Sequence, residues 1–199
     1  MRRLYDWVLG WSESRWGEAA LFVLAFAESS FFPIPPDVLL IALCLGHPRR
    51  SFRYAAICMA GSVLGGVAGY SIGYFLWQTA AGDPTGIAQW CYAHLFSPEQ
   101  FSSVQRTFEQ YDFWAIFTAG FTPVPYKLFT IASGVFGINV PMFVLASIVS
   151  RGARFFLISW LIRRFGPPIR VFIDRYFNLL AIAFTVLLIG TFVLVKYIV

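Results

Sequence analysis

The sequence F-F-P-I-P at residues 31–35 recurs ninety positions later as F-T-P-V-P at residues 121–125. Each copy interrupts a hydrophobic stretch, and a charged residue follows each copy at the same distance, Asp37 after the first and Lys127 after the second. Proline removes a backbone donor and clashes with the preceding helical turn, so neither stretch is expected to form one continuous helix. The prolines at the two breaks are Pro33, Pro35, Pro36, Pro123 and Pro125. Matching breaks in two halves of a chain indicate an inverted repeat with a binding site near the bilayer midplane.

The composition is that of an integral membrane protein. Of the 199 residues, 58% are hydrophobic and 13% are charged, and the mean hydropathy is +0.68. A soluble domain has roughly 45–50% apolar and about 25% charged residues. The net charge of +5 does not indicate nucleic-acid binding, because the arginines flank apolar spans and no basic-aromatic platform is present. The three cysteines and two histidines lack metal or redox spacing, so no metal or cofactor is expected.

The hydrophobic segments predict an all-α polytopic protein. We expect an interfacial amphipathic helix at residues 1–17, a membrane domain at 18–165 and a C-terminal transmembrane helix at 176–198. Within the membrane domain, transmembrane helices are predicted at 54–80 and 140–162, a loop at 82–96 and a short amphipathic helix at 97–111. The start of that helix is indicated by Ser97 as N-cap, Pro98 at the first helical position and Glu99 in the first turn.

The two interrupted segments, residues 19–46 and 113–137, are predicted to be re-entrant hairpins. Each of their arms has about 10–14 residues, whereas a helix that crosses the membrane needs about 20. Irregular backbone at this depth is tolerated only where it is buried in protein or lines a wet cavity. The segments between the two hairpins carry the chain across the membrane once, so we expect the hairpins to enter from opposite leaflets and to meet tip to tip.

Four glycines at i, i+4 spacing form one face of the predicted helix at residues 54–80: Gly61, Gly65, Gly69 and Gly73. Such a stripe lets another helix approach closely. We expect it to pack against the hairpins, and the alternatives are a gating surface or a face that joins two copies in a homo-oligomer.

The basic residues predict the orientation. If hairpins return to their own side, ten arginines share the side of the N-terminus: Arg2, Arg3, Arg15, Arg49, Arg50, Arg53, Arg163, Arg164, Arg170 and Arg175. The opposite side holds Arg106 and Lys196. Positive residues mark the cytoplasmic side. The N-terminus is therefore predicted inside and the C-terminus outside.

Five ionisable residues lie within apolar segments: Glu28, Asp37, Lys127, Arg151 and Arg154. A charge at the bilayer centre costs about 2.5–3.5 kcal/mol on insertion scales, so these side chains are expected to face a cavity or one another. Arg151 and Arg154 share a helix face. With Lys127 and the helix N-termini that follow the prolines, they predict a phosphate site. Glu28 and Asp37 are predicted to bind protons, because burial disfavours an ionised carboxylate. The alternative is a purely structural ion-pair network.

The stretch from Glu28 to Asp37, E-S-S-F-F-P-I-P-P-D, resembles the DedA family of bacterial membrane proteins, also called VTT-domain or SNARE-associated proteins. The phrases G-F-T-P-V-P-Y-K at 120–127, A-S-G at 132–134 and R-G-A-R at 151–154 resemble its YqaA-like branch, and the resemblance covers about residues 17–165. The family's acidic positions fall on Glu28 and Asp37. Typical members carry an arginine where this chain has Gly120 and another near Tyr126. We hypothesise that Arg151 and Arg154 supply the missing charge.

The resemblance implies two opposed re-entrant hairpins in the bacterial inner membrane and a role in moving lipids between leaflets. In bacteria the implied cargo includes undecaprenyl phosphate, with protons as the coupling ion, and eukaryotic relatives are regarded as phospholipid scramblases. Together with the five charges, it predicts a transporter of a phosphate-bearing lipid rather than an enzyme. An uncoupled scramblase and a membrane scaffold without transport are the alternatives. An intramembrane enzyme would need a nucleophile or metal set, which the sequence does not display.

Overall fold

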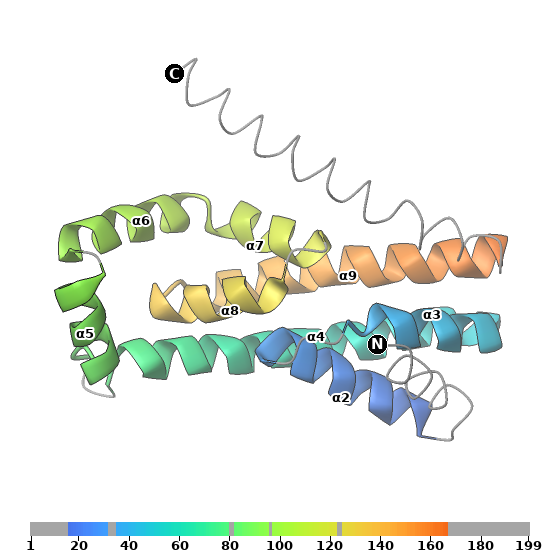
Figure 1. Ribbon diagram of the computed structural model, residues 1–199. Helices are drawn as coiled ribbons and strands as arrows, with labels where there is room; N and C mark the ends of the chain where they lie inside the picture. Colours follow the sequence, from blue (N-terminus) through green and yellow to red (C-terminus); the bar gives the residue numbers. More distant parts are fainter. Residues whose placement is uncertain (1–15, 32–34, 80–81, 96, 123–124, 167–199) are drawn as a thin grey trace, which may run out of the picture.

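The computed structural model describes residues 16–31, 35–79, 82–95, 97–122 and 125–166. The predicted helices at 1–17 and 176–198 lie almost entirely outside this part, as do Pro33 and Pro123. Regular structure in the described residues consists of helices: α2 Gly17–Ser30, α3 Asp37–Gly46, the 3-10 turn η1 Pro48–Arg50, α4 Ser51–Trp77, α5 Gly86–His94, α6 Pro98–Gln110, α7 Asp112–Phe121, α8 Tyr126–Val135 and α9 Val140–Phe165 (Figure 1).

Two of these helices, α4 and α9, have the length and composition of membrane spans. They contain 27 and 26 residues, which at 1.5 Å per residue gives about 40 Å each, more than the roughly 30 Å hydrocarbon core of a bilayer. Helix α4 (Ser51–Trp77) overlaps most of the transmembrane helix predicted at 54–80, and α9 (Val140–Phe165) contains the one predicted at 140–162. They run in opposite directions through the molecule, and α2, α3, α7 and α8 pack against one or both of them (Figure 1).

Both proline phrases end one helix and begin another. The first interrupted segment, α2 and α3, has arms of 14 and 10 residues. The second, α7 and α8, has two arms of 10 residues. None of these arms is longer than about 21 Å, so none spans a bilayer alone. The chain doubles back on itself between α2 and α3 and again between α7 and α8 (Figure 1), which is the backbone path that a pair of hairpins requires.

The glycines of α4 allow both interrupted segments to approach its backbone. A Cβ atom at Gly61 or Gly65 would meet the backbone of Phe22 or Phe26 in α2. One at Gly69 would meet the side chain of Thr130 in α8 as well as a carbonyl of α2, and one at Gly73 would meet the backbone of Ile131 in α8. The first part of the glycine stripe therefore packs against the first interrupted segment, and the last part packs against the second.

The predicted loop at residues 82–96 is wrong over most of its length, because Gly86–His94 forms helix α5. Thr85 caps it by accepting a hydrogen bond from the backbone N–H of Ala88. Gly82 and Pro84 occupy the turn before this cap, and Gly86 is the first residue of the helix itself. The predicted start of α6 is confirmed: Ser97 and Gln100 form a reciprocal capping box, with Pro98 in the first turn.

Aromatic side chains join α5 and α6 to the end of the bundle. The indole ring of Trp77, the last residue of α4, stacks on Phe101 of α6 with centroids 4.9 Å apart and packs edge-on against Tyr92 of α5. Phe101 also contacts Phe136, the residue that directly follows α8. This cluster fixes the two short helices at one end of α4, away from the charged residues described next.

Candidate functional site

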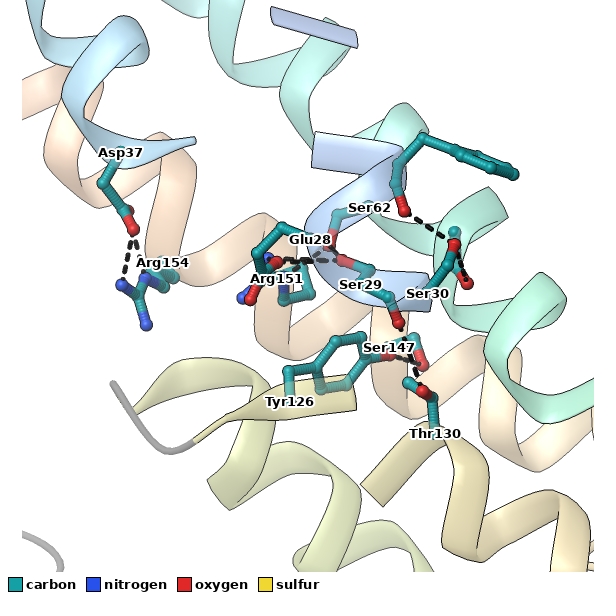
Figure 2. Close-up of polar contacts among 12 residues, drawn as sticks. Glu28, Ser29, Ser30, Asp37, Ser62, Tyr126, Thr130, Ser147, Arg151 and Arg154 are labelled. Carbon is teal, nitrogen blue, oxygen red and sulfur yellow. Dashed lines mark hydrogen bonds and ion pairs between the residues drawn. The ribbon is translucent and has the colours of Figure 1, made fainter. Parts of the chain in front are cut away.

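Four of the five charges predicted to lie inside the membrane domain meet in its interior. Arg151 and Arg154, one turn apart on α9, are 2% and 7% exposed. Each forms an ion pair with one of the two acidic residues of the first interrupted segment, Glu28 of α2 or Asp37 of α3 (Figure 2). The spacing of three residues on α9 places both guanidinium groups on one face of that helix.

Arg151 is held from four directions. Its Nη2 atom donates to Oε2 of Glu28 at 2.6 Å, and its Nε atom donates to Oγ of Ser62 on α4 at 2.5 Å. Its guanidinium carbon lies 4.9 Å from the ring centroid of Tyr126 and 4.8 Å from that of Phe155. Aromatic faces attract a cation, and the attraction grows when the pair is shielded from water. Arg151 therefore contacts α2, α4 and α8 at once.

Arg154 contacts residues beside both proline interruptions. Its Nη2 and Nε atoms donate to the two carboxylate oxygens of Asp37 at 2.8 and 3.3 Å, the two-pronged arrangement that makes arginine–carboxylate pairs strong. Its Nη1 atom donates to the carbonyl oxygen of Thr122 at 2.7 Å. Asp37 begins α3, where an acid also suits the helix dipole, and Thr122 directly follows α7. The two breaks consequently lie beside the same guanidinium group.

Hydroxyl groups that the sequence analysis did not single out complete the cluster. Oγ of Ser29 lies 2.6 Å from Oγ of Ser62 and donates to Glu28 at 3.1 Å. The hydroxyl of Thr130 in α8 donates to the Ser29 carbonyl oxygen at 3.2 Å, which links the two interrupted segments directly. The Tyr126 hydroxyl donates to Oγ of Ser147 at 2.5 Å. Within the described residues, every buried side-chain nitrogen or oxygen has a hydrogen-bond partner.

Lys127 does not join the paired charges. It is the second residue of α8 and half-buried, and no carboxylate in the described part of the chain lies within ion-pair distance of its ammonium group. The predicted set of five charges thus separates into two neutral pairs and one cation. A phosphate could contact Lys127 without displacing a carboxylate, whereas it would have to compete for either arginine.

Gly120 lies close to the arginine pair, although it carries no side chain. A Cβ atom at this position would meet the side chain of Ser150 on α9 and would lie 3.5 Å from Cδ of Arg151. A side chain at residue 120 would therefore collide with Ser150 unless that side chain moved. The position at which the family resemblance leads us to expect an arginine thus lies beside Arg151 of α9.

The described residues offer no cluster of three or more His, Cys, Asp or Glu side chains that could hold a metal ion. Cys44 and Cys58 are buried and Cys91 is half-buried, and none of the three forms a disulfide.

The fold and the site define a helical membrane protein with paired charges between two interrupted segments. The VTT-domain family model matches residues 32–164, so the chain belongs to the VTT-domain family, the DedA family. A Haemophilus influenzae protein described as uncharacterized is 34% identical over 175 residues, which cover 86% of this chain and 87% of that relative. A Histophilus somni protein, described as a homologue of an uncharacterized protein, is 32% identical with the same coverage. No solved structure matches the chain significantly.

Proposed function

We propose that this protein moves a phosphate-bearing lipid, undecaprenyl phosphate or a phospholipid, between the leaflets of the bacterial inner membrane. The observation that carries the proposal is that Arg151 and Arg154 each contact both interrupted segments in the interior. Charges at this depth are costly and are rarely kept without a function. A scaffold that only packs against a partner would have no use for them.

The paired arrangement suggests how a phosphate would be taken up. With Glu28 and Asp37 ionised, both arginines are neutralised, so an entering phosphate has to replace a carboxylate. Proton binding to a carboxylate weakens its hold on the guanidinium group, which then becomes available to the phosphate. Lys127 and the start of α8 would supply further positive potential. In this scheme protons are the coupling ion, and the two acids are the residues that bind them.

The same contacts would have to change during transport. Arg154 links Asp37 to Thr122, and Thr130 links α8 to α2. Any rocking of one segment against the other has to break these bonds. We propose that exchanging them for lipid contacts exposes the site to one leaflet and then to the other, with the two segments acting as opposed re-entrant hairpins.

The proposed orientation is supported by the charges at the two ends of the bundle. The end formed by the start of α4 and the close of α9 carries Arg49, Arg50, Arg53, Arg163 and Arg164. The opposite end, where α4 leads into α5 and α6, carries Asp83, Glu99 and Glu109, with Arg106 as its one arginine among the described residues. Because positive residues face the cytoplasm, a cysteine introduced at Arg50 should be labelled only from the cytoplasmic side and one at Asp83 only from outside. A cysteine at Pro168, which lies outside the described residues, is also predicted to be labelled only from the cytoplasmic side. The reverse pattern for Arg50 and Asp83 would contradict the orientation.

The direct test is reconstitution of the full chain in liposomes with a leaflet-specific assay. Undecaprenyl phosphate is compared with neutral and anionic phospholipids, with and without a proton gradient. We expect flipping of a phosphate-bearing lipid that depends on the gradient. Flipping of every lipid without a gradient would favour an uncoupled scramblase, and no flipping of any lipid would favour the scaffold.

A further inference from the structure

A shallow pocket opens at the arginine-rich end of the molecule, where α3 leads into α4. It has a volume of about 430 Å³ and is lined by His47, Pro48, Arg49 and Arg50. The 3-10 turn that carries these arginines contacts α9, and the last turn of α9 carries Arg163 and Arg164. Arg49 and Arg50 line the pocket itself, and the neighbouring helix supplies the two further arginines.

Among the described residues, the cations around this pocket are not paired with carboxylates. Glu18 is paired with Arg53, with Oε2 and Nη2 atoms 2.7 Å apart. Over the described ranges, no carboxylate pairs with Arg49, Arg50, Arg163 or Arg164. The pocket thus has an excess of positive charge, in contrast to the balanced pairs in the interior. A concave surface of this kind concentrates anions.

Apolar surface adjoins these charges on the outer face of α4 and α9. The guanidinium carbon of Arg163 lies 5.1 Å from the ring centroid of Phe52, and that ring stacks on Phe156 at 6.1 Å. Both rings are more than a third exposed. A cation that rests on exposed aromatic rings at a helix end is suited to the boundary between lipid tails and headgroups. A ligand here would meet positive charge at one end and apolar surface at the other.

We propose that this end of the molecule binds the headgroup of an anionic glycerophospholipid at the cytoplasmic surface. The phosphate would contact Arg49, Arg50 and Arg163, and the acyl chains would lie along Phe52 and Phe156. Basic pockets between transmembrane helices on the cytoplasmic side are suited to such headgroups. The site is distinct from the interior cluster, since Arg163 lies nine residues beyond Arg154 on α9, about 13 Å along the helix axis.

The proposal is tested by titrating the purified full chain, in a neutral detergent, with short-chain phosphatidylglycerol and measuring bound lipid by native mass spectrometry. Phosphatidylcholine with the same acyl chains and inorganic phosphate are the two comparison ligands. We expect phosphatidylglycerol to bind and both comparison ligands to bind at least tenfold more weakly. Equal binding of phosphatidylcholine would show that the tails alone are recognised, and equal binding of phosphate would show that no lipid is required; either result overturns the proposal.

Single arginine replacements distinguish a defined lipid-binding site from a general electrostatic attraction of anionic lipid to this end of the protein. Arg49→Gln and Arg163→Gln should each weaken phosphatidylglycerol binding about fivefold, the effect expected of one arginine near an anionic surface. Arg53→Gln removes the same charge at the same end, but Arg53 is paired with Glu18 and is not one of the proposed phosphate contacts. Arg106→Gln removes the charge on α6. Both variants should change binding less than twofold. An effect of Arg53→Gln as large as that of Arg49→Gln would overturn the proposal. All four side chains are exposed, and thermal unfolding without lipid verifies that each variant is folded.

Discussion

The two interrupted segments share a proline phrase and a change of direction, but they present different chemistry to α9. The first segment supplies two carboxylates, Glu28 and Asp37, which pair with Arg151 and Arg154. The second supplies neutral groups to the same arginines, the ring of Tyr126 and the carbonyl oxygen of Thr122. The repeat therefore reproduces a backbone break but not the chemistry: the first segment pairs carboxylates with the arginines, and the second contacts them through an aromatic ring and a carbonyl oxygen.

The largest effect should come from removing one acid of the first segment. Glu28→Ala or Asp37→Ala leaves a buried guanidinium group without its carboxylate, and breaking a buried pair in this way costs about 3–5 kcal/mol. We expect lipid flipping to be abolished and the unfolding temperature to fall, while the protein still inserts in the membrane. Flipping assays and thermal unfolding in detergent measure the two effects. Wild-type flipping by both variants would remove the proton-site hypothesis.

A somewhat smaller effect is expected where the glycine stripe meets each segment. Gly65→Val would push α2 away from α4, and Gly73→Val would push α8 away. Overpacking of this kind costs about 1–3 kcal/mol, so both variants should unfold at a lower temperature by similar amounts. Gly46→Val is the control, because nothing lies within 4 Å of a Cβ atom placed there. If Gly46→Val is as unstable as the two stripe variants, the glycines of α4 are not needed for the close approach of α2 and α8.

Changes at Tyr126 should be milder, since its contribution is neutral. Tyr126→Phe removes the hydrogen bond to Ser147, worth about 0.5–1.5 kcal/mol, and keeps the ring beside Arg151. Tyr126→Leu removes the ring as well, so it should cost about 0.5–2 kcal/mol more through the lost cation–π contact. Chemical denaturation of the two variants measures the difference. Equal stability of Phe and Leu at this position would argue that the ring does not hold the guanidinium group.

The smallest effect is expected for the exposed pair of Glu18 and Arg53. Their side chains are 30% and 63% exposed, compared with 17% and 3% for Glu28 and Arg151, and the ion-pair distances are nearly equal at 2.7 and 2.6 Å. Surface pairs contribute about 0–1 kcal/mol because water and salt screen them. Arg53→Gln should therefore leave both the unfolding temperature and lipid flipping near their wild-type values. A loss of lipid flipping in Arg53→Gln would mean that burial of an ion pair does not determine whether it is needed for transport.

Much of the helical arrangement could be predicted from sequence, because prolines, length and hydropathy act locally. The breaks at residues 31–36 and 121–125, and the long helices α4 and α9, follow from such local rules. Helix α5 could not be foreseen in the same way, because its N-cap Thr85 stands among glycines and a proline that are typical of a loop. Its docking depends on contacts of Trp77 with Tyr92 and Phe101, which join residues far apart in the chain.

The candidate site was predictable as a list of charges but not as a set of partners. The apolar sequence around Glu28, Asp37, Arg151 and Arg154 singled these residues out. The pairing of each acid with its arginine depends on how α2 and α3 dock on α9, which lies more than a hundred residues later in the chain. Ser62 was missed as a partner of Arg151, because a serine in a glycine-rich helix is indistinguishable from a small packing residue until the helices are assembled. A hydroxyl residue beside a glycine stripe is the signal that could have found it.

The most direct test of the central claim compares two matched pair replacements in a leaflet-specific flipping assay. Glu28→Leu with Arg151→Met removes the buried pair and leaves no unpaired charge, which keeps stability near that of the wild type. Glu18→Leu with Arg53→Met does the same at the surface. The account predicts that the first double variant remains folded but no longer flips a phosphate-bearing lipid, while the second flips it at the wild-type rate. If the folded Glu28→Leu, Arg151→Met protein flips lipid as fast as the wild type, the buried charges are structural and the proposed transport site is wrong.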